Sequence, residues 1–200
     1  MIGKRLFDIA LSLLGLTFLA PLFLLIAVLI KAESSGPVFF RQERVGLHGR
    51  PFRIHKFRTM RADRESAGPL LTIGADPRIT RVGRFLRRYK LDELPQLIDV
   101  LLGRMSLVGP RPEVPKYVAL YPEEVHEKVL SVRPGITDWA SIRFRDENAL
   151  LGRAADPERA YVEEVLPIKL RFYLEYVDTR SFLVDLRIIF ATIAAVFRRD

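Results

Sequence analysis

The octapeptide Lys90-Leu-Asp-Glu-Leu-Pro-Gln-Leu97 carries two adjacent acids, Asp92 and Glu93, between an arginine-rich segment and an apolar one. Pro95 lacks an N–H group and disfavours helix just before itself, so it belongs in the first turn of a helix. We therefore expect a helix that begins near Asp92. Its free N–H groups and positive dipole end would attract a carboxylate or a phosphate, which makes this octapeptide a candidate site. The alternative is structural: Asp92 caps the helix and Glu93 lies in its first turn.

The composition restricts the partners of the chain. Its 200 residues suggest one domain, and its net charge of +8 favours an anionic partner: nucleic acid, anionic lipid or a phosphorylated small molecule. The absence of cysteine excludes disulfides and thiolate metal sites. The three histidines, His48, His55 and His126, do not have the spacing of metal ligands.

The amino-terminal segment predicts a membrane helix. After Lys4, Arg5 and Asp8, residues 9–30 carry no charge, and at about 1.5 Å per residue they can cross a hydrocarbon core of roughly 30 Å. This run exceeds the usual apolar region of a cleaved signal peptide, which is about 7–15 residues long. It therefore favours a retained membrane segment over a cleaved leader.

Charge on both flanks of this segment bears on its topology. Lys4 and Arg5 precede it and a basic body follows it, and both flanks prefer the cytoplasmic side of a membrane. A helix that enters, breaks at Pro21 and returns satisfies both flanks, because proline removes a backbone hydrogen bond and kinks a helix. We therefore expect a re-entrant helical hairpin over residues 1–33. The alternative is a spanning helix with a tolerated proline.

Short strands are expected after the membrane segment. Residues 38–42 and 51–57 alternate apolar and polar side chains around the turn-rich residues 46–49, which predicts a β-hairpin. Lys56 and Arg58 share a face because the strand period is two, so both could reach one phosphate, or both could lie on a solvated basic face. Residues 61–77 are expected to form a loop and residues 78–88 a cationic helix, in which Val82, Phe85 and Leu86 recur at helical spacing.

Arginines recur in the second half of the chain. Arg111 lies between two prolines, which hold its backbone extended and suit its guanidinium to phosphate oxygens. Arg143 and Arg145 alternate with apolar residues, so we expect them on one face of a strand or extended loop, or on a salt-bridged surface. The apolar stripe of residues 182–197 predicts an interfacial helix, with a buried core helix as the alternative. Together these segments predict an α+β fold of a small hairpin or mixed sheet, short helices and interfacial amphipathic helices.

Five motifs give the chain a resemblance that covers nearly its whole length. They are Lys56-Phe-Arg-Thr-Met60, Asp76-Pro-Arg-Ile-Thr-Arg-Val-Gly-Arg-Phe-Leu-Arg87, Leu91-Asp-Glu-Leu-Pro-Gln-Leu97, Met105-Ser-Leu-Val-Gly-Pro-Arg-Pro112 and Arg133-Pro-Gly-Ile-Thr137. With the membrane segment, they make the chain similar to the monotopic phosphoglycosyl transferases, the bacterial sugar transferase family that starts polyprenol-linked glycan assembly. Its length resembles that of the minimal members.

The resemblance implies a location and a reaction. Residues 1–33 would form a re-entrant helix kinked at Pro21, and residues 34–200 a catalytic domain with a carboxyl-terminal interfacial helix on the cytoplasmic face of the bacterial inner membrane. Asp92 would attack the β-phosphate of a UDP-sugar, release UMP and pass the phosphosugar to undecaprenyl phosphate. Mg²⁺ would offset the repulsion between these anions, with Asp92 as its contact and Glu93 orienting the metal or handling a proton.

The resemblance also implies roles for the basic residues. Lys56, Arg58, Arg87 and Arg111 align with basic family positions and are the phosphate-binding candidates, and Arg143 and Arg145 are candidates for the nucleotide or sugar side. Anionic membrane lipids are further expected partners, a homodimer is left open, and nothing resembles a nucleic-acid recognition helix.

Two departures and two rival functions accompany the resemblance. Ala20 stands where many members have serine, and Asp138 stands where many have glycine. The identity of the donor sugar is therefore not inferred from relatives that have glycine at that position. The rivals are a membrane-associated glycosyltransferase that releases UDP and a non-catalytic relative that binds lipid phosphate.

Overall fold

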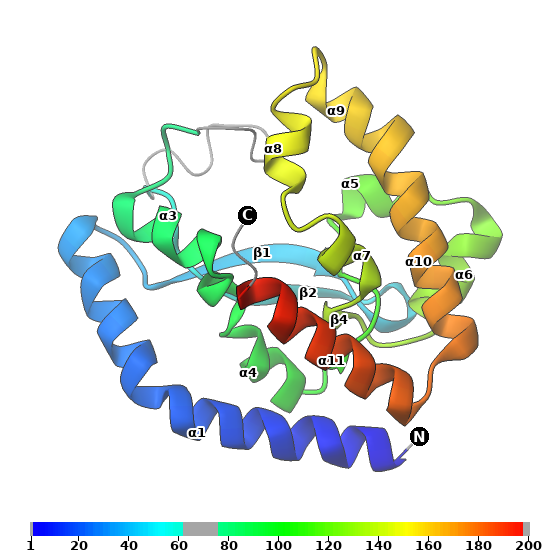
Figure 1. Cartoon of the computed structure of the whole chain (residues 1–200), viewed down its shortest axis with the longest axis horizontal. Helices are drawn as coiled ribbons and strands as arrows, with labels where there is room; N and C mark the ends of the chain where they lie inside the picture. The colour runs from blue at the N-terminus through cyan, green and yellow to red at the C-terminus, as the bar shows by residue number, and fades with distance from the viewer. Residues whose placement is uncertain (1, 62–75, 198–200) are drawn as a thin grey trace. The chain divides into compact units, whose positions relative to one another are not determined.

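The computed structural model describes residues 2–61 and 76–197, which form helices and two small sheets (Figure 1). This confirms the mixed class of the predicted α+β fold. The α-helices are α1 (Ile2–Glu33), α3 (Arg81–Arg88), α4 (Gln96–Leu101), α5 (Pro115–Val118), α6 (Glu123–Leu130), α7 (Trp139–Arg143), α8 (Glu147–Leu151), α9 (Pro157–Ala160), α10 (Leu166–Thr179) and α11 (Phe182–Phe197). The strands are β1 (Phe39–Val45), β2 (Pro51–Phe57), β3 (Ser106–Val108) and β4 (Gly135–Thr137); Leu47–Gly49 and Leu91–Glu93 are 3₁₀ turns and Tyr161–Val165 is a π-helical turn.

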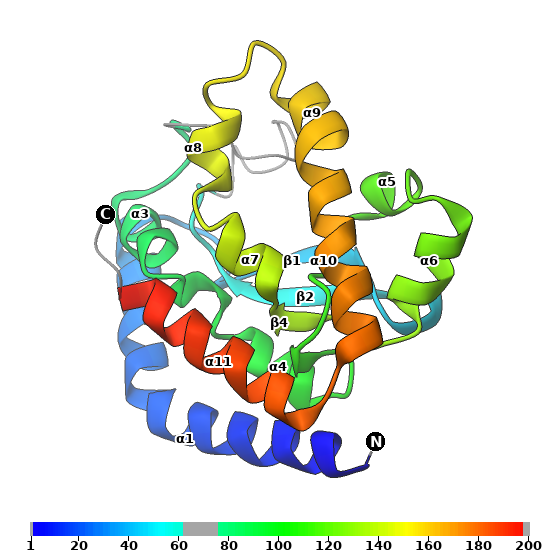
Figure 2. The same cartoon turned by 45° about the vertical axis from the view of Figure 1, so that its right-hand side comes forward.

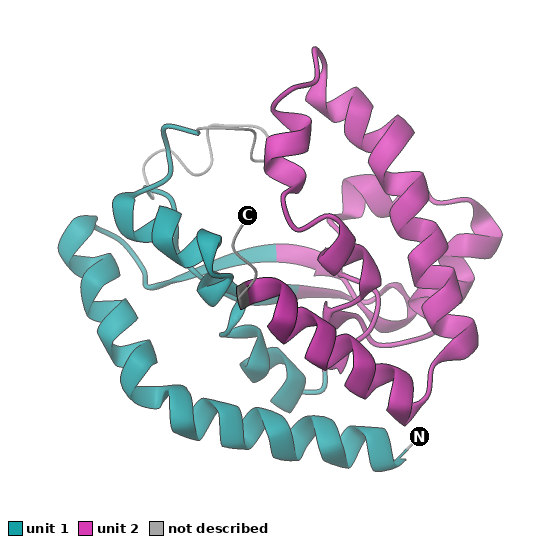
Figure 3. Cartoon of the chain, in the orientation of Figure 1, with its two compact units in different colours: residues 1–42, 53–70, 75–103 teal, residues 43–52, 71–74, 104–200 magenta. Residues whose placement is uncertain are grey.

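These elements divide into two compact units (Figure 3). The described part of unit 1 comprises residues 2–42, 53–61 and 76–103, and that of unit 2 comprises residues 43–52 and 104–197. The predicted boundary between residues 33 and 34 separates a membrane segment from a catalytic domain rather than one compact unit from another, and it stays a prediction.

Helix α1 is long and apolar enough to cross a membrane, and it is the one such helix in residues 2–61 and 76–197. Most of its apolar side chains are exposed, Phe18 at 81% among them. The helix is continuous through Pro21 and bends near its middle (Figure 1). Pro21 accounts for a bend because it cannot donate to the carbonyl of Thr17. The structure thus has one bent helix where we expected two helices joined by a break, and a re-entrant course stays a prediction.

Unit 1 has a small apolar core beneath the second half of α1. Ile26 and Ile30 of α1 pack with Phe57 of β2 and Leu86 of α3, all at most 3% exposed. The first half of α1 packs against α4, where Gly15 leaves room for Leu97: a Cβ atom at position 15 would lie 3.2 Å from Leu97 Cδ1. Helices α3 and α4 are therefore anchored to α1.

The predicted hairpin is confirmed: β1 and β2 pair in a two-stranded sheet, with a 3₁₀ turn between them. His48 and Gly49 take positive φ angles of 55° and 75° in this turn, which glycine adopts at little cost. The expected loop over residues 61–77 lies outside the described residues except at Arg61, Asp76 and Pro77.

The predicted cationic helix is confirmed as α3, although Phe85 does not share the buried face that its spacing suggested. Thr80 caps the helix by accepting from Gly83 N at 2.9 Å, and the Glu33 carboxylate accepts from Val82 N at 2.8 Å. Leu86 is buried as expected, whereas Phe85 is 56% exposed. The spacing of Phe85 suited the apolar face, but in the folded chain α1 and Thr59 cover only the Val82–Leu86 side.

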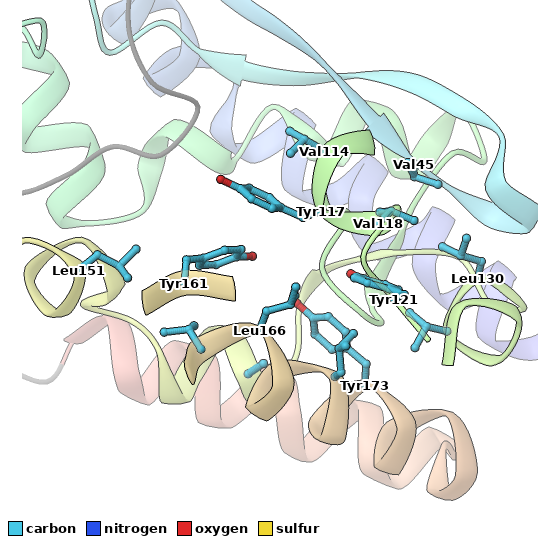
Figure 4. Close-up of a cluster of buried hydrophobic side chains, with 14 residues drawn as sticks. Val45, Val114, Tyr117, Val118, Tyr121, Leu130, Leu151, Tyr161, Leu166 and Tyr173 are labelled. Atoms are coloured by element: carbon cyan, nitrogen blue, oxygen red, sulfur yellow. The ribbon is translucent and has the colours of Figure 1, made fainter. Parts of the chain in front are cut away.

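Unit 2 is built around a parallel pair of strands. β3 and β4 pair in register, Ser106 with Gly135 and Val108 with Thr137, and α10 runs beside α6 (Figures 1 and 2). The core of this unit is rich in tyrosine (Figure 4); the ring of Tyr117 lies 4.7 Å from that of Tyr161, measured between centroids. Buried hydroxyl groups usually need partners: the Tyr161 hydroxyl donates to Glu113 Oε1 at 2.8 Å, whereas Tyr173 Oη has no hydrogen-bond partner in the described residues.

Two expectations for the second half of the chain have different outcomes. The expectation that Arg143 and Arg145 lie on one face of a strand or extended loop is wrong for Arg143, which ends α7, because Asp138 caps a helix there. The predicted carboxyl-terminal helix is confirmed as α11. Its Ile188 is fully buried, while Phe190 and Ile193 are more than half exposed. An apolar exposed face fits an interfacial helix, which stays a prediction.

Candidate active site

The two acids lie in a 3₁₀ turn, Leu91–Glu93, and the α-helix that follows begins only at Gln96. The expectation that the helix begins near Asp92 is therefore wrong by one turn. Pro95 is the N-cap residue of α4, and 3₁₀-type bonds lead into the helix: Leu97 N donates to Leu94 O at 3.1 Å and Ile98 N donates to Pro95 O at 3.0 Å. Because α4 has six residues and starts beyond the acids, cationic side chains rather than a helix dipole dominate the field at Asp92.

Asp92 is a buried carboxylate with an unused oxygen. Its side chain is 7% exposed, and its Oδ1 atom has no hydrogen-bond partner within the described parts of the chain. Burial raises the pKa of Asp92, the charge of Lys56 opposes this, Glu93 adds to it and Arg87 opposes it. An unused carboxylate oxygen among cations is chemically competent as a nucleophile or as a metal ligand.

Lys56 and Glu93 form an ion pair beside Asp92. Lys56 Nζ lies 2.7 Å from Glu93 Oε1, and both side chains are largely buried. Strand β2 carries Lys56, so this pair fixes the 3₁₀ turn against the hairpin. The contact holds the ammonium group next to the acid pair.

Arg87 of α3 is the second cation at the acids. Its Nε atom donates to Thr59 Oγ1 at 2.8 Å. Burial lowers the pKa of Arg87, and the negative charge of Asp92 is the largest influence that raises it. The guanidinium stays charged at any ordinary pH. Unit 1 thus brings together Lys56, Arg87, Asp92 and Glu93.

Arg58 has backbone contacts that the sequence argument did not expect, and its phosphate-binding role stays a prediction. Its guanidinium is 2% exposed and donates to the carbonyl oxygens of Ser34, at 2.7 Å, and of Ser35. These carbonyls follow the end of α1, where helix bonding has stopped and acceptors need donors. Arg58 lies just beyond β2, so the period-two argument that paired it with Lys56 does not extend to it.

The other three basic candidates belong to unit 2. Arg111 is half-buried in the segment after β3, Arg143 is exposed at the end of α7, and Arg145 donates to Ala195 O of α11 at 2.5 Å. The structure places these three residues in one unit and the acid pair in the other.

Asp138 is a helix cap. It is 1% exposed, and its carboxylate accepts from Ser141 N at 2.7 Å and from Ser141 Oγ at 3.1 Å. Burial raises the pKa of Asp138, and the hydrogen bond from Ser141 N and the charge of Arg111 oppose this. At this departure from glycine, the structure therefore has a buried helix cap within the electrostatic influence of Arg111.

The sequence argument missed two buried polar residues of α4. Asp99 is fully buried and accepts from the backbone N–H of His55 at 2.7 Å and from its ring Nδ1 at 2.8 Å. Gln96 is 1% exposed, and its Nε2 atom has no hydrogen-bond partner in residues 2–61 and 76–197. A charge inside the apolar run Leu97-Ile-Asp-Val100 was the available signal for Asp99.

Asp92 is the residue that fits the expected Mg²⁺. In the described residues, no group of three or more histidine, aspartate or glutamate side chains could hold a metal. Mg²⁺ keeps several waters and takes one or two carboxylates together with substrate phosphates, so a full protein cage is not needed. The unused Oδ1 of Asp92 fits this requirement.

Comparison with known proteins places the chain in a family. Residues 1–199 match the family model described as bacterial sugar transferase. The chain is 40% identical over 196 residues to an uncharacterized sugar transferase, EpsL, of Bacillus subtilis (strain 168), covering 98% of this chain and 88% of that protein. The chain therefore belongs to the bacterial sugar transferase family, as its motifs predicted, and is a phosphoglycosyl transferase.

Two further relatives have names that state a reaction. The chain is 43% identical over 207 residues to the undecaprenyl-phosphate glucose phosphotransferase of Komagataeibacter xylinus, covering 100% of this chain and 37% of that protein. It is 39% identical over 193 residues to the UDP-glucose:undecaprenyl-phosphate glucose-1-phosphate transferase of Escherichia coli (strain K12), covering 95% of this chain and 39% of that protein. The chain thus spans under two fifths of the length of these two relatives.

Proposed function

We propose that the chain transfers a sugar 1-phosphate from a UDP-sugar to undecaprenyl phosphate and releases UMP. The names of the Komagataeibacter and Escherichia relatives support this reaction for glucose in those proteins. The observation that carries the proposal is the buried carboxylate of Asp92, with one unused oxygen, within the influence of Lys56 and Arg87.

In the first step, an Asp92 oxygen attacks the β-phosphorus of the donor. A bond forms between them, the bond from that phosphorus to the bridging oxygen breaks, and UMP leaves with the electron pair. In the second step, a phosphate oxygen of undecaprenyl phosphate attacks the same phosphorus and releases the Asp92 carboxylate. Covalent catalysis by a carboxylate divides one difficult transfer into two easier ones.

The charged neighbours of Asp92 influence its ionisation and stabilise the negative charge of the substrates. Attack requires the ionised carboxylate, whereas burial favours the protonated one. Lys56 and Arg87 oppose this upward shift of the pKa, and their charges offset the repulsion between a carboxylate and a diphosphate. Bound Mg²⁺ would supply further positive charge to the phosphates, with Asp92 as its protein ligand. Glu93 holds Lys56 in place and is a candidate for orienting the metal or moving a proton.

The donor and the membrane are assigned to other parts of the chain. We assign Arg111 to phosphate and Arg143 to the nucleotide or sugar side; Arg145 is a weaker candidate for that side because Ala195 already accepts from it. Helix α1 would enter the cytoplasmic leaflet of the bacterial inner membrane and return after its bend, and α11 would lie in the interface among anionic lipids.

Nucleotide release tests the reaction. The purified protein in detergent is given Mg²⁺, undecaprenyl phosphate and a panel of UDP-sugars, and UMP and UDP are separated by chromatography. We expect lipid-dependent UMP that Asp92→Asn abolishes. Asp178→Asn is the matched control, because Asp178 is an exposed acid paired with Lys128. UDP in place of UMP would establish plain glycosyl transfer, and a fully active Asp92→Asn variant would refute the covalent step.

The topology of α1 is tested separately. The chain has no cysteine, so a single cysteine placed at Lys4 is a unique label site. We expect an impermeant thiol reagent to leave this cysteine unmodified in intact cells and to modify it after lysis. Labelling from outside would establish a spanning helix.

A further inference from the structure

Lys169 is a buried lysine to which the proposed reaction gives no role. It lies on α10 in unit 2, and its side chain is 5% exposed. Lysine is almost never this buried unless it is paired, because removing an ammonium group from water is costly. A buried charge of this kind indicates that specific partners surround the ammonium group.

Two carboxylates and a tyrosine surround this ammonium group. Lys169 Nζ lies 2.5 Å from Glu147 Oε2 and 3.7 Å from Glu113 Oε1. It also lies 3.4 Å from Tyr161 Oη and 4.8 Å from the centroid of that ring. The Tyr161 hydroxyl in turn donates to Glu113 Oε1 at 2.8 Å. One cation therefore ties Glu113 to Glu147, both directly and through the tyrosine.

The two carboxylates belong to the arginine-bearing segments of unit 2. Glu113 follows Arg111 by two residues, and Glu147 follows Arg145 by two and Arg143 by four. Glu113 precedes α7 and Glu147 follows it, so sequence proximity does not hold the two carboxylates together. Lys169 is a direct link between them.

The Arg111 segment is fixed on its other side as well. Val45 N donates to Glu113 O at 3.0 Å, and Arg44 donates to Pro112 O at 3.0 Å. The guanidinium of Arg44 also lies 3.7 Å from Glu113 Oε2. The backbone around Arg111 is therefore clamped between the hairpin tip and Lys169, in addition to being stiffened by its prolines.

We propose that Lys169 is a positioning residue that sets the separation between Arg111 and the Arg143–Arg145 segment, so that both contact one nucleoside diphosphate. The proposal rests on the proposed function for the identity of the donor. Lys169 touches no substrate in it and acts through Glu113 and Glu147. Positioning matters because a displacement of about 1 Å can cost about a hundredfold in rate.

Two variants separate positioning from stability. Lys169→Met alone leaves the buried Glu113 and the half-buried Glu147 without their shared cation, which endangers folding. The double variant Lys169→Met with Glu147→Gln removes one charge of each sign, so it keeps the buried charge balanced and should fold. Lys169→Arg retains the cation and is the conservative rescue. Lys128→Met is the matched control, because Lys128 forms an exposed pair with Asp178.

Steady-state UMP release gives the first readout. We expect the double variant to raise KM for the UDP-sugar about tenfold or more, with a smaller fall in kcat, since binding groups are misplaced while the nucleophile is intact. Lys169→Arg should recover part of this loss, and Lys128→Met should match wild type. An unchanged KM in a folded double variant would overturn the proposal and leave the proposed function standing.

Binding of UDP gives a second readout that needs no turnover. Trp139, the single tryptophan, opens α7 between Glu113 and Glu147 in the chain, so we choose its fluorescence as the signal for UDP binding. We expect a Kd for UDP about tenfold weaker in the double variant and unchanged in Lys128→Met. Equal Kd values for the double variant and wild type would refute the positioning role even in a protein that releases no UMP.

Discussion

Arg58 gives the sharpest test of how the structure reassigns a residue. The sequence motif assigns it to phosphate, whereas the structure has its guanidinium donating to the carbonyls of Ser34 and Ser35. We expect Arg58→Met to unfold at a lower temperature and, when assayed below that temperature, to retain the wild-type KM for the UDP-sugar.

The magnitude follows from these contacts. A hydrogen bond from a charged donor contributes about 1.5–3 kcal/mol, so losing the bonds to Ser34 and Ser35 costs about 3–6 kcal/mol. The contact with Ile30 O is 3.5 Å long and adds little. Methionine also removes Nε of Arg58, which is buried without a partner in the described residues and therefore costs free energy in the native protein. The lower part of the range, about 3–4 kcal/mol, is expected, which corresponds to a fall in Tm of about 6–16 °C for a chain of this length.

Thermal unfolding in detergent, followed by Trp139 fluorescence, measures this shift. Arg50→Met is the matched control: Arg50 is exposed in the hairpin turn, and its loss should cost no more than about 0.5 kcal/mol. A variant at Arg58 with unchanged Tm and a raised KM would show that the structural assignment is mistaken and that Arg58 binds phosphate.

Three further predictions concern unit 1. Asp92→Asn should raise Tm and abolish UMP release. Burial raises the pKa of this carboxyl, so its neutral form stabilises the fold at low pH, and this stability is lost as pH rises through the raised pKa. Because attack requires the ionised carboxylate, kcat/KM should fall on acidification. Glu33→Gln should cost about 1 kcal/mol in urea unfolding, because Glu33 accepts hydrogen bonds from N–H groups of α3. Burial raises the pKa of Glu33, but these bonds lower it by more, so the wild-type contribution disappears as pH falls through the lowered pKa. A difference in unfolding free energy that does not change with pH would contradict this. Gly83→Ala should destabilise by about 1–3 kcal/mol because its Cβ would lie 2.1 Å from Thr59 O, whereas Gly3→Ala, with open space around it, is the control; equal Tm values would refute this packing argument.

Local patterns predicted part of the secondary structure, and they gave no residue ranges for β3, β4, α5, α6, α8, α9 or α10. The uncharged run of residues 9–30 predicted α1, the alternation around residues 46–49 predicted the hairpin, and the arginine-rich segment predicted α3. These features depend on neighbours along the chain, which a sequence displays directly. The errors fell where two local rules met, as at Pro95, whose place as N-cap rather than first-turn residue moved the start of α4 beyond the acids.

The motifs identified the candidate site in the sequence, but they did not show that residues close together within a motif have different contacts in the folded chain. Lys56 and Arg58 are two residues apart in one motif; the first is held at the acid pair by Glu93, and the second is tied to the carbonyls after α1. Asp138 follows another motif and caps α7. The difference lies in which backbone groups each side chain meets, and these come from distant parts of the chain.

The sequence by itself determined the family, the membrane-length helix, the acid pair and the set of candidate cations. Only the tertiary structure decided that Asp92 is buried with an unused oxygen, that Arg58 donates to the carbonyls after α1 and that Lys169 joins two carboxylates 34 positions apart in the chain. The physical reason is that residue type and spacing set hydrophobicity and local bonding. Burial, pKa and ion pairing depend on the groups that folding brings within a few ångströms.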